Sequence, residues 1–290
     1  MLTDEQLRIR QSRLSATDFG VILGLNEWRN AADLALEKRG ALEPLPPTDE
    51  QDIGNRLEPA VLHWGADSIG AQLDMTAART IVHPSLDWLC ATPDAGIVGA
   101  NQGAEAKTAG IKRGFALRGV WGDEDSADVP DLYTVQAQIQ MAVTGWELVW
   151  LFALIAGRGF ARFQIARDDD MIGELVSIGE RWHHKHIVNA DPVEGVLPSL
   201  ETLARVRRES GSWAEINPAL VTMYESLGKM ETATKESRDE VKRKILDSLG
   251  DAEGARLPDG RVLTYLKQQR KEYTVKATEF RKLAITKEKP

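Results

Sequence analysis

The sequence Ala91-Thr-Pro-Asp94-Ala-Gly96 is followed by Glu105-Ala-Lys107, with ten residues between the aspartate and the glutamate. Three glycines lie in the connection, where a tight hairpin would place Asp94 beside Glu105. Side chains alternate between the two faces of a strand, so Glu105 and Lys107 would project to the same side. The pattern therefore predicts a β-hairpin that brings two carboxyl groups and one ammonium group to one point.

This cluster has the composition of a divalent-cation site. Two neighbouring carboxylates repel each other, which raises the pKa of one of them unless a cation joins the pair. Mg²⁺ or Mn²⁺ binds carboxylate and carbonyl oxygens and keeps several waters, so either ion suits this cluster and phosphate chemistry alike. The amine of Lys107 would orient or help to deprotonate an attacking water, or stabilise negative charge on a phosphorus centre.

Length and composition limit the class of protein. The chain has 290 residues, of which 42% are apolar and 28% charged, a mixture that supports one large domain or one domain with an appendage. Its single cysteine excludes a disulfide framework, a four-cysteine zinc site and a cysteine-ligated iron–sulfur cluster. No apolar stretch reaches the ~18–20 residues that span a bilayer, and the first residues are acidic where a signal peptide is basic and then apolar. We expect a soluble, cytoplasmic protein with no membrane partner.

Charge is distributed unevenly along the chain. Residues 1–200 carry 17 Lys and Arg against 29 Asp and Glu, a net charge of −12, whereas residues 201–290 carry 19 against 15, a net charge of +4. Phosphate neutralisation by Lys and Arg dominates the binding of proteins that coat nucleic acid, so the acidic body argues against that class. It does not exclude a nuclease, because a narrow basic strip can coexist with an acidic exterior.

Apolar periodicity predicts helices along much of the chain. Helical spacing indicates a short helix within residues 13–24, capped by Ser15 or Thr17, and a long charged helix over residues 218–249. Residues 43–50 are too rich in proline and acid to be a core element. Further helices are predicted over residues 31–39, 53–69, 130–145 and 171–187.

Strands are predicted in the middle of the chain. Residues 149–155 form an apolar run typical of a buried central strand, with residues 160–166 as its hairpin partner. Residues 258–261 indicate a turn between two short strands in an appended, mildly basic module over residues 200–290. Short runs bounded by turns are typical of strands of one sheet at residues 80–83, 89–92, 96–99 and 103–108.

Several motifs together resemble a known family. Pro93-Asp94 with Glu105-Ala-Lys107 is similar to the PD-(D/E)xK nuclease motif. In the lambda exonuclease and YqaJ recombinase group of phage-type exonucleases, an acidic helix that resembles Gly54-Asn-Arg-Leu-Glu58 precedes this motif. A helix that resembles Tyr133-Thr-Val-Gln136 follows it, and residues 23–38 resemble the opening helices of that group. These elements occur in the same order over about residues 10–195, which makes the resemblance specific.

The resemblance implies a fold and an activity. It implies an α/β, restriction-endonuclease-like core over residues 1–199, with a mixed central sheet flanked by helices, and a small helix and hairpin module of unknown role over residues 200–290. It implies a Mg²⁺-dependent exonuclease, able to use Mn²⁺, that digests double-stranded DNA from its ends in the 5′-to-3′ direction and leaves 3′ single-stranded overhangs for recombination by strand annealing. A ring-shaped homotrimer, a single-strand annealing protein as partner, and a phage or prophage origin in a bacterial cytoplasm are also implied.

The resemblance assigns the metal site residue by residue. Asp94 and Glu105 would be metal ligands, and the carbonyl of Ala106 would add a third oxygen. Glu58, on its helix, would complete or support the site. Lys107 would act on the nucleophilic water.

Contacts with the DNA substrate are implied in the same way. Gln136 would position the water or the lysine, and Tyr133 would pack beside the scissile strand. The family anchors a terminal 5′-phosphate with an arginine and a small hydroxyl residue seven positions later, a spacing that Arg10 and Thr17 share. Arg13 lies close enough in sequence to be the phosphate-binding arginine instead.

Other polar and aromatic residues have two interpretations each. Lys112 and Arg113 follow the lysine of the motif and are candidates for contact with the phosphate backbone or for a solvated loop. Trp121 would stack on a base or pack in the core. The three histidines within residues 183–186 have the spacing of a solvent-facing cluster near a helix end, which we favour over a metal site.

Three other classes of protein remain open at this stage. A PD-(D/E)xK endonuclease of the restriction or junction-resolving type would use the same cluster but would also cut covalently closed circular DNA. A non-catalytic DNA-binding recombination mediator is opposed by the unbroken set of Glu58, Asp94, Glu105 and Lys107. A structural protein built on residues 218–249 as a coiled coil is opposed by the short apolar seam of that helix.

Overall fold

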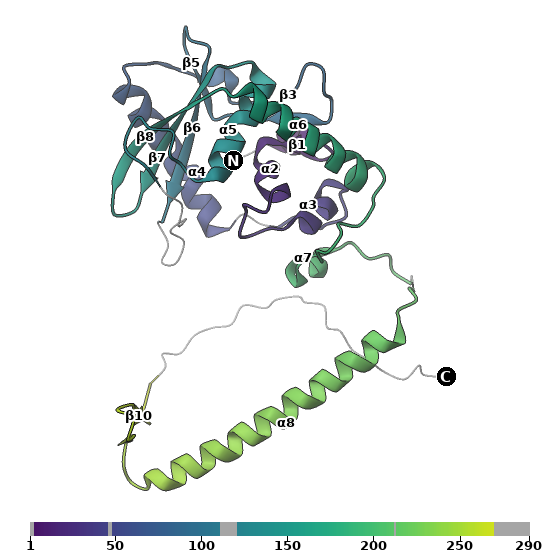
Figure 1. The fold of residues 1–290 in the computed structure, drawn as a ribbon, viewed down its shortest axis with the longest axis vertical. Coiled ribbons are helices and arrows are strands. Elements are labelled where there is room, and N and C mark those ends of the chain that lie inside the picture. Colours follow the sequence, from purple (N-terminus) through teal and green to yellow (C-terminus); the bar gives the residue numbers. More distant parts are fainter. Residues whose placement is uncertain (1–2, 46–47, 111–120, 212, 270–290) are drawn as a thin grey trace. The chain divides into compact units, whose positions relative to one another are not determined.

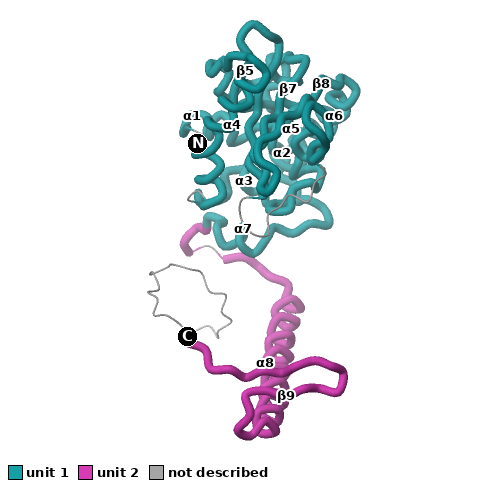
Figure 2. Tube along the Cα trace, turned by 90° about the vertical axis from the view of Figure 1, so that its left-hand side faces the viewer, with its two compact units in different colours: residues 1–207 teal, residues 208–290 magenta. Residues whose placement is uncertain are grey.

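The chain divides into two compact units, residues 1–207 and residues 208–290 (Figure 2). The computed structural model describes residues 3–45, 48–110, 121–211 and 213–269. The boundary expected at residues 199 and 200 lies eight residues later, because the segment around α7 (Leu200–Arg205) pairs with the first unit. The N–H of Glu43 donates to the carbonyl of Arg205 at 2.9 Å, and the N–H of Arg207 donates to the carbonyl of Ala41 at 2.8 Å.

A five-stranded mixed sheet forms the centre of the first unit (Figure 1). β6 and β7 are parallel, and the other neighbouring pairs are antiparallel. Parallel neighbours need a crossover connection, which here contains α5 (Asp131–Thr144). The expected mixed sheet flanked by helices is confirmed. Its strand order is β2 (Leu73–Asp74), β5 (Ala95–Ile97), β6 (Gln102–Ala109), β7 (Leu148–Ile155) and β8 (Gly159–Ala166).

Helices cover both faces of this sheet. Alternate residues of β7 point to opposite faces. Val149, Leu151 and Ala153 pack with α5, whereas Phe152 packs with α4 (Asp49–Ser68). A strand buried on both faces has no polar side, which explains why residues 149–155 are continuously apolar.

A second sheet in the first unit has the strand order β1-β4-β3. β4 (Leu89–Ala91) is parallel to β1 (Leu14–Ser15) and antiparallel to β3 (Ile81–Val82). The prediction that residues 80–108 contribute four strands to one sheet is therefore wrong. Pro93 has no N–H to donate and separates β4 from β5, so the two strands pair in different sheets. The segment Thr92-Pro93-Asp94 joins the two sheets.

Helix positions are close to those predicted, with one clear shift. α4 begins at Asp49, four residues earlier than expected, because the side chain of Thr48 accepts a hydrogen bond from the N–H of Gln51 and caps the helix. The last two residues of the predicted loop at 43–50 are thus helical. The remaining helices are α1 (Asp4–Arg10), α2 (Ala16–Ile22), α3 (Ala31–Lys38), the 3₁₀ turn Met75–Ala77, and α6 (Asp169–His183), which continues into a π-helical segment, His184–Val188.

The second unit contains the long helix and the hairpin that the sequence predicts. α8 (Pro218–Leu249) has no buried side chain, and β9 (Gly254–Arg256) pairs antiparallel with β10 (Val262–Thr264). Within the described ranges, no helix is both long enough and apolar enough to span a lipid bilayer.

We predict that Gly65→Ala destabilises the first unit. A Cβ atom at this position of α4 would lie 2.1 Å from the ring of Phe152, which is completely buried and has no room to move. Overpacking of this kind costs about 1–3 kcal/mol, which outweighs the gain of roughly 0.5–1 kcal/mol that alanine has over glycine inside a helix. Urea denaturation of the full chain should give a lower midpoint for the variant.

Gly173→Ala in α6 is the matched control for this prediction. In the described part of the chain, nothing outside its own helix lies within 4 Å of the added Cβ atom. This variant should keep or raise the urea midpoint. An equal fall for both variants would contradict the packing of α4 against β7.

Candidate active site

The hairpin between β5 and β6 brings Asp94 and Glu105 together. Ala95 pairs with Ala104 in antiparallel register, so Asp94 and Glu105 occupy the next opposed positions. The main-chain N–H of Ala106 donates to Asp94 Oδ2 at 2.8 Å. The sequence spacing therefore places the two acidic residues side by side on neighbouring strands.

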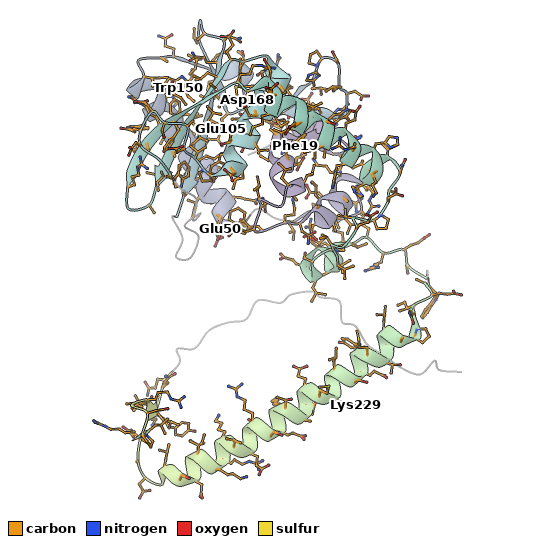
Figure 3. All side chains as sticks on the ribbon, in the orientation of Figure 1. Phe19, Glu50, Glu105, Trp150, Asp168 and Lys229 are labelled. Atoms are coloured by element: carbon orange, nitrogen blue, oxygen red, sulfur yellow. The ribbon has the colours of Figure 1, made fainter. Side chains whose placement is uncertain are left out.

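Figure 3 labels Glu105 within the first unit. The side chains of Glu105 and Lys107 project from β6 toward α5, where they contact Gln136 and Tyr133. Lys107 Nζ donates to Glu105 Oε1 at 2.7 Å, and the glutamate is only 5% exposed. Ala104 and Ala106 face the opposite way and pack in the cluster that contains α4 residues. The alternation expected for this strand places the amine on the same side as the carboxylate.

Two glutamines of α5 hold the carboxylate of Glu105. Gln136 Nε2 donates to Oε1 at 2.5 Å, and Gln140 Nε2 donates to Oε2 at 2.7 Å. The two side chains are one helical turn apart and share a face of the helix. One turn earlier, the ring of Tyr133 lies 5.1 Å from Lys107 Nζ in a cation–π contact. Sequence reasoning missed Gln140, although its spacing of four residues from Gln136 was the available sign.

Burial and like charge set the pKa values in this cluster. Burial and then the neighbouring Glu105 carboxylate raise the pKa of Asp94 well above its ordinary value. Burial alone would lower the pKa of Lys107, but the charges of Glu105 and Asp94 outweigh it and raise that pKa. Burial also raises the pKa of Glu58. The cluster thus contains more acidic side chains than amines. A divalent cation would compensate the remaining negative charge.

The donor set fits a divalent cation with two carboxylate ligands. Glu58 lies on α4, on the other face of the sheet from α5, and no hydrogen bond within the described residues joins it to the cluster. The charges of Glu105 and Lys107 act on the pKa of Glu58, and the charge of Glu58 helps to raise the pKa of Asp94. Among the described residues, no three His, Cys, Asp or Glu side chains are grouped closely enough to hold a metal ion. Glu58 is therefore not placed as a third direct ligand. Mg²⁺ commonly binds one or two carboxylates and keeps its remaining waters, so Asp94 and Glu105 suit it.

A separate polar cluster, the Arg10 pocket, consists of the guanidinium of Arg10 and three hydroxyl groups that accept its hydrogen bonds. The guanidinium donates to Thr17 Oγ1 at 3.1 Å, to Ser15 Oγ at 2.9 Å and to Thr92 Oγ1 at 3.3 Å. The spacing of seven residues between Arg10 and Thr17 thus corresponds to a contact. Ser15 and Thr92 were not predicted as pocket residues, and the position of Thr92 two residues before Asp94 was the sign that sequence reasoning did not use.

Arg13 donates its hydrogen bonds elsewhere. Arg13 Nε donates to the carbonyl of Asp87 at 2.7 Å, and Arg13 Nη1 donates to the carbonyl of Ile9 at 3.0 Å. Its guanidinium therefore holds main chain in place. Lys112 and Arg113 lie outside the described residues.

A buried aspartate supports the Arg10 pocket from the inside. Asp18 Oδ2 accepts hydrogen bonds from the N–H and hydroxyl of Ser15 and lies 2.6 Å from Lys38 Nζ, and Oδ1 lies 2.9 Å from Arg29 Nη2. Lys38 also donates to the carbonyl of Arg10 at 3.0 Å. Burial alone would raise the pKa of Asp18, but Lys38, Arg29 and Arg10 hold it well below its ordinary value.

The structure favours one interpretation of Trp121 and corrects the expectation for one histidine. Trp121 packs on Tyr133 and Phe163, with ring centroids 5.7 and 5.3 Å apart, which favours the core interpretation. His186 is buried and its Nδ1 lies 3.0 Å from the carbonyl of Asp191, so this histidine is not solvent-facing as predicted.

Comparisons with known proteins agree with this fold. Residues 5–147 match the model of the YqaJ-like viral recombinase domain. Protein YqaJ of Bacillus subtilis (strain 168), described as uncharacterized, is 27% identical over 265 residues, which cover 86% of this chain and 80% of that protein. The crystal structure of LHK-Exo, an alkaline exonuclease from Laribacter hongkongensis, in complex with dAMP is 19% identical and matches with a TM-score of 0.51 over 64% of this chain and 94% of that one.

The fold is thus the restriction-endonuclease-like fold of phage-type exonucleases. Residues 5–147 therefore resemble the YqaJ-like viral recombinase domain, and the chain is similar to protein YqaJ over most of its length.

We predict that Asp18→Asn loses about 3–5 kcal/mol of unfolding free energy at neutral pH, because it leaves the buried Lys38 without its carboxylate. The folded-state pKa of Asp18 is lowered, so its stabilisation is complete above the ordinary value of 3.8 and is lost as the pH falls below that value. The difference between wild type and variant should therefore narrow at about pH 3. Urea denaturation at neutral pH and at about pH 3 measures both differences; one that stays constant would show that Asp18 is not an ion-pair anchor.

Proposed function

We propose that this protein is a divalent-metal-dependent deoxyribonuclease that digests double-stranded DNA from its ends in the 5′-to-3′ direction. Mg²⁺ would be the ordinary ion, with Mn²⁺ able to replace it. The observation that carries the proposal is the cluster on the β5–β6 hairpin, where Asp94 lies opposite Glu105 and Lys107 is bonded to that glutamate. The match of residues 5–147 to the YqaJ-like viral recombinase domain and the likeness in fold to an alkaline exonuclease support it.

The side chains of the cluster divide the chemistry among them. Asp94 and Glu105, with the carbonyl of Ala106, would hold the ion, which when bound supplies a Lewis acid and an activated water. Lys107 Nζ would stabilise the negative charge that builds on the scissile phosphate. Gln136 donates to the same glutamate oxygen as Lys107 and would keep the amine in place.

The Arg10 pocket favours an exonuclease over an endonuclease. An arginine surrounded by the hydroxyl groups of Ser15, Thr17 and Thr92 is a suitable site for a terminal 5′-phosphate, because charge-assisted hydrogen bonds are the strong ones. Thr92 is two residues from Asp94, so this pocket lies next to the proposed metal site. An endonuclease has no use for a pocket that recognises a strand end.

The proposal extends to the assembly and its partners. Resemblance to phage-type exonucleases supports a ring-shaped homotrimer threaded by double-stranded DNA and transfer of the 3′ strand to a single-strand annealing protein. A closed ring would also let an acidic protein hold DNA, because only the channel lining has to be basic.

Lys107→Ala should reduce cleavage by about 10²–10⁴-fold while leaving DNA binding nearly intact, because the amine acts on the reacting phosphate. The variant also loses its ion pair with Glu105, so thermal unfolding must show that it is folded before its rate is compared. The assay is digestion of end-labelled linear duplex with and without Mg²⁺, which also reads out polarity. Lys185→Ala is the matched control, since Lys185 pairs with Glu194 on the surface. Turnover of the Lys107 variant at the wild-type rate would overturn the assignment, and digestion of covalently closed circles would favour an endonuclease.

Arg10→Gln should remove any preference for 5′-phosphorylated over 5′-hydroxyl ends, a change of about 10–100-fold if one charge-assisted hydrogen-bonding group is lost. Arg13→Gln should keep the preference, because Arg13 contacts main-chain carbonyls instead of the pocket hydroxyls. Initial rates on the two kinds of end, measured for wild type and both variants, test this. Equal wild-type rates on both ends would show that no such pocket operates.

A further inference from the structure

We infer that Gln140 is a positioning residue that orients the Glu105 carboxylate for a divalent cation and thereby sets the affinity of the site for that ion. The inference rests on the proposed function. Gln140 lies one helical turn beyond Gln136, outside the motif that carries the family resemblance. Its side chain is 1% exposed, and its Nε2 donates to Glu105 Oε2 at 2.7 Å.

The donors around Glu105 determine which part of its carboxylate faces an ion. A carboxylate offers about four lone-pair positions on its two oxygens. Lys107 and Gln136 both donate to Oε1, whereas Gln140 donates to Oε2. Among the described residues this leaves one position on Oε2 for a cation. Gln140 therefore fixes both the plane of the carboxylate and the direction in which its remaining lone pair points.

A glutamine at this position is not explained by packing. Its Oε1 has no hydrogen-bond partner within the described part of the chain, and a buried amide oxygen without a partner costs free energy. The same helix buries apolar side chains at Ile139 and Met141, so burial alone does not call for an amide on this helix. What glutamine adds is the charge-assisted hydrogen bond to Glu105.

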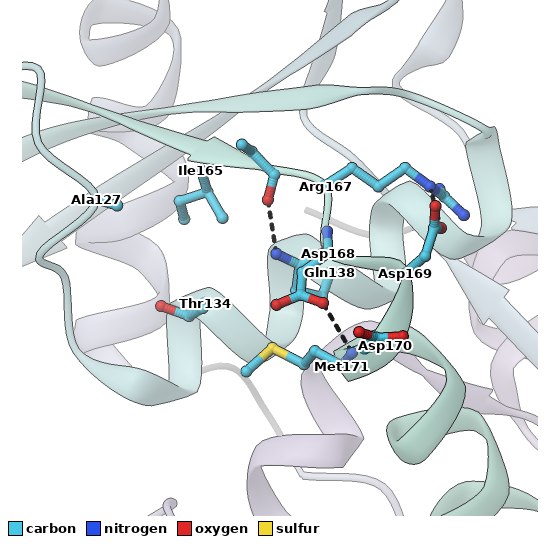
Figure 4. Close-up of a pocket in the computed structure, with 10 residues that line it drawn as sticks. Ala127, Thr134, Gln138, Ile165, Arg167, Asp168, Asp169, Asp170 and Met171 are labelled. Carbon is cyan, nitrogen blue, oxygen red and sulfur yellow. Dashed lines mark hydrogen bonds and ion pairs between the residues drawn. The ribbon is translucent and has the colours of Figure 1, made fainter.

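Gln138 provides an internal comparison on the same helix (Figure 4). It is 3% exposed, but its Nε2 donates to the carbonyl of Ala166 at 2.8 Å and its Oε1 accepts from the N–H of Asp168 at 3.0 Å. Both ends of this amide therefore bind main chain where β8 leads into α6, and neither is directed at Glu105. Gln138 and Gln140 share residue type, helix and burial, and differ in what they bind.

The test is Mn²⁺ binding to the full chain without DNA, measured by isothermal titration calorimetry. Gln140→Met should raise the Kd for Mn²⁺ by about 10–100-fold, the usual effect of losing a group that orients a metal ligand. Gln138→Met should bind Mn²⁺ as wild type does, even though it loses two hydrogen bonds. Gln140→Asn keeps the amide but is one methylene shorter, and it should behave like Gln140→Met. Thermal unfolding without metal records the stability of each variant.

The outcomes separate this inference from the proposed function. If wild type binds no Mn²⁺, the proposed function fails. If wild type binds Mn²⁺ and the two Gln140 variants bind it as tightly as wild type does, the inference fails and the nuclease proposal stands. An equal loss in Gln138→Met and Gln140→Met would also overturn the inference, because it would reflect a general loss of stability. Selective loss in the Gln140 variants that fold supports it.

Discussion

Two acidic side chains next to each other inside a protein impose a constraint that the rest of the N-terminal unit satisfies. Neighbouring buried carboxylates raise each other's pKa and cannot both stay charged without compensation. Asp94 receives a main-chain N–H, and Glu105 receives an amine and two amides. Those amides come from α5, so the same hydrogen bonds that compensate the charge also hold α5 against the sheet. The packing of this helix and the compensation of the buried charge therefore depend on the same contacts.

A second buried acid organises the neighbouring pocket in a similar way. Asp18 gathers Lys38 and Arg29 around one carboxylate, and through Ser15 and Lys38 it fixes the side chains and main chain around Arg10. Here the charge is compensated by cations within the protein. At Asp94 and Glu105, one amine compensates only part of the negative charge. This is the electrostatic difference between Asp18, which stabilises the fold, and the Asp94–Glu105 pair, which is suited to bind an ion.

Local patterns predicted much of this fold, and long-range pairing accounts for what they missed. Strand alternation and the glycines before Glu105 were sufficient to predict the hairpin, because both are properties of adjacent residues. Sheet membership was wrong because β4 pairs with Leu14–Ser15, far away in the sequence, and no local period encodes that choice. The domain boundary was early for the same reason, since Val206 forms a bridge with Leu42. The role inferred for Gln140 depends on which strand residue lies against its face of α5, and only the fold reveals that residue.

The link Thr92-Pro93-Asp94 has a consequence for the product of the proposed reaction. It connects strands of two different sheets, its middle residue has a fixed φ angle, and two residues of chain span at most about 7 Å. A terminal phosphate bound at Thr92 and a metal ion bound at Asp94 would thus be kept at a fixed separation. A DNA strand seated on both would be measured from its terminus by the protein backbone. The length of each released fragment would then be independent of base sequence.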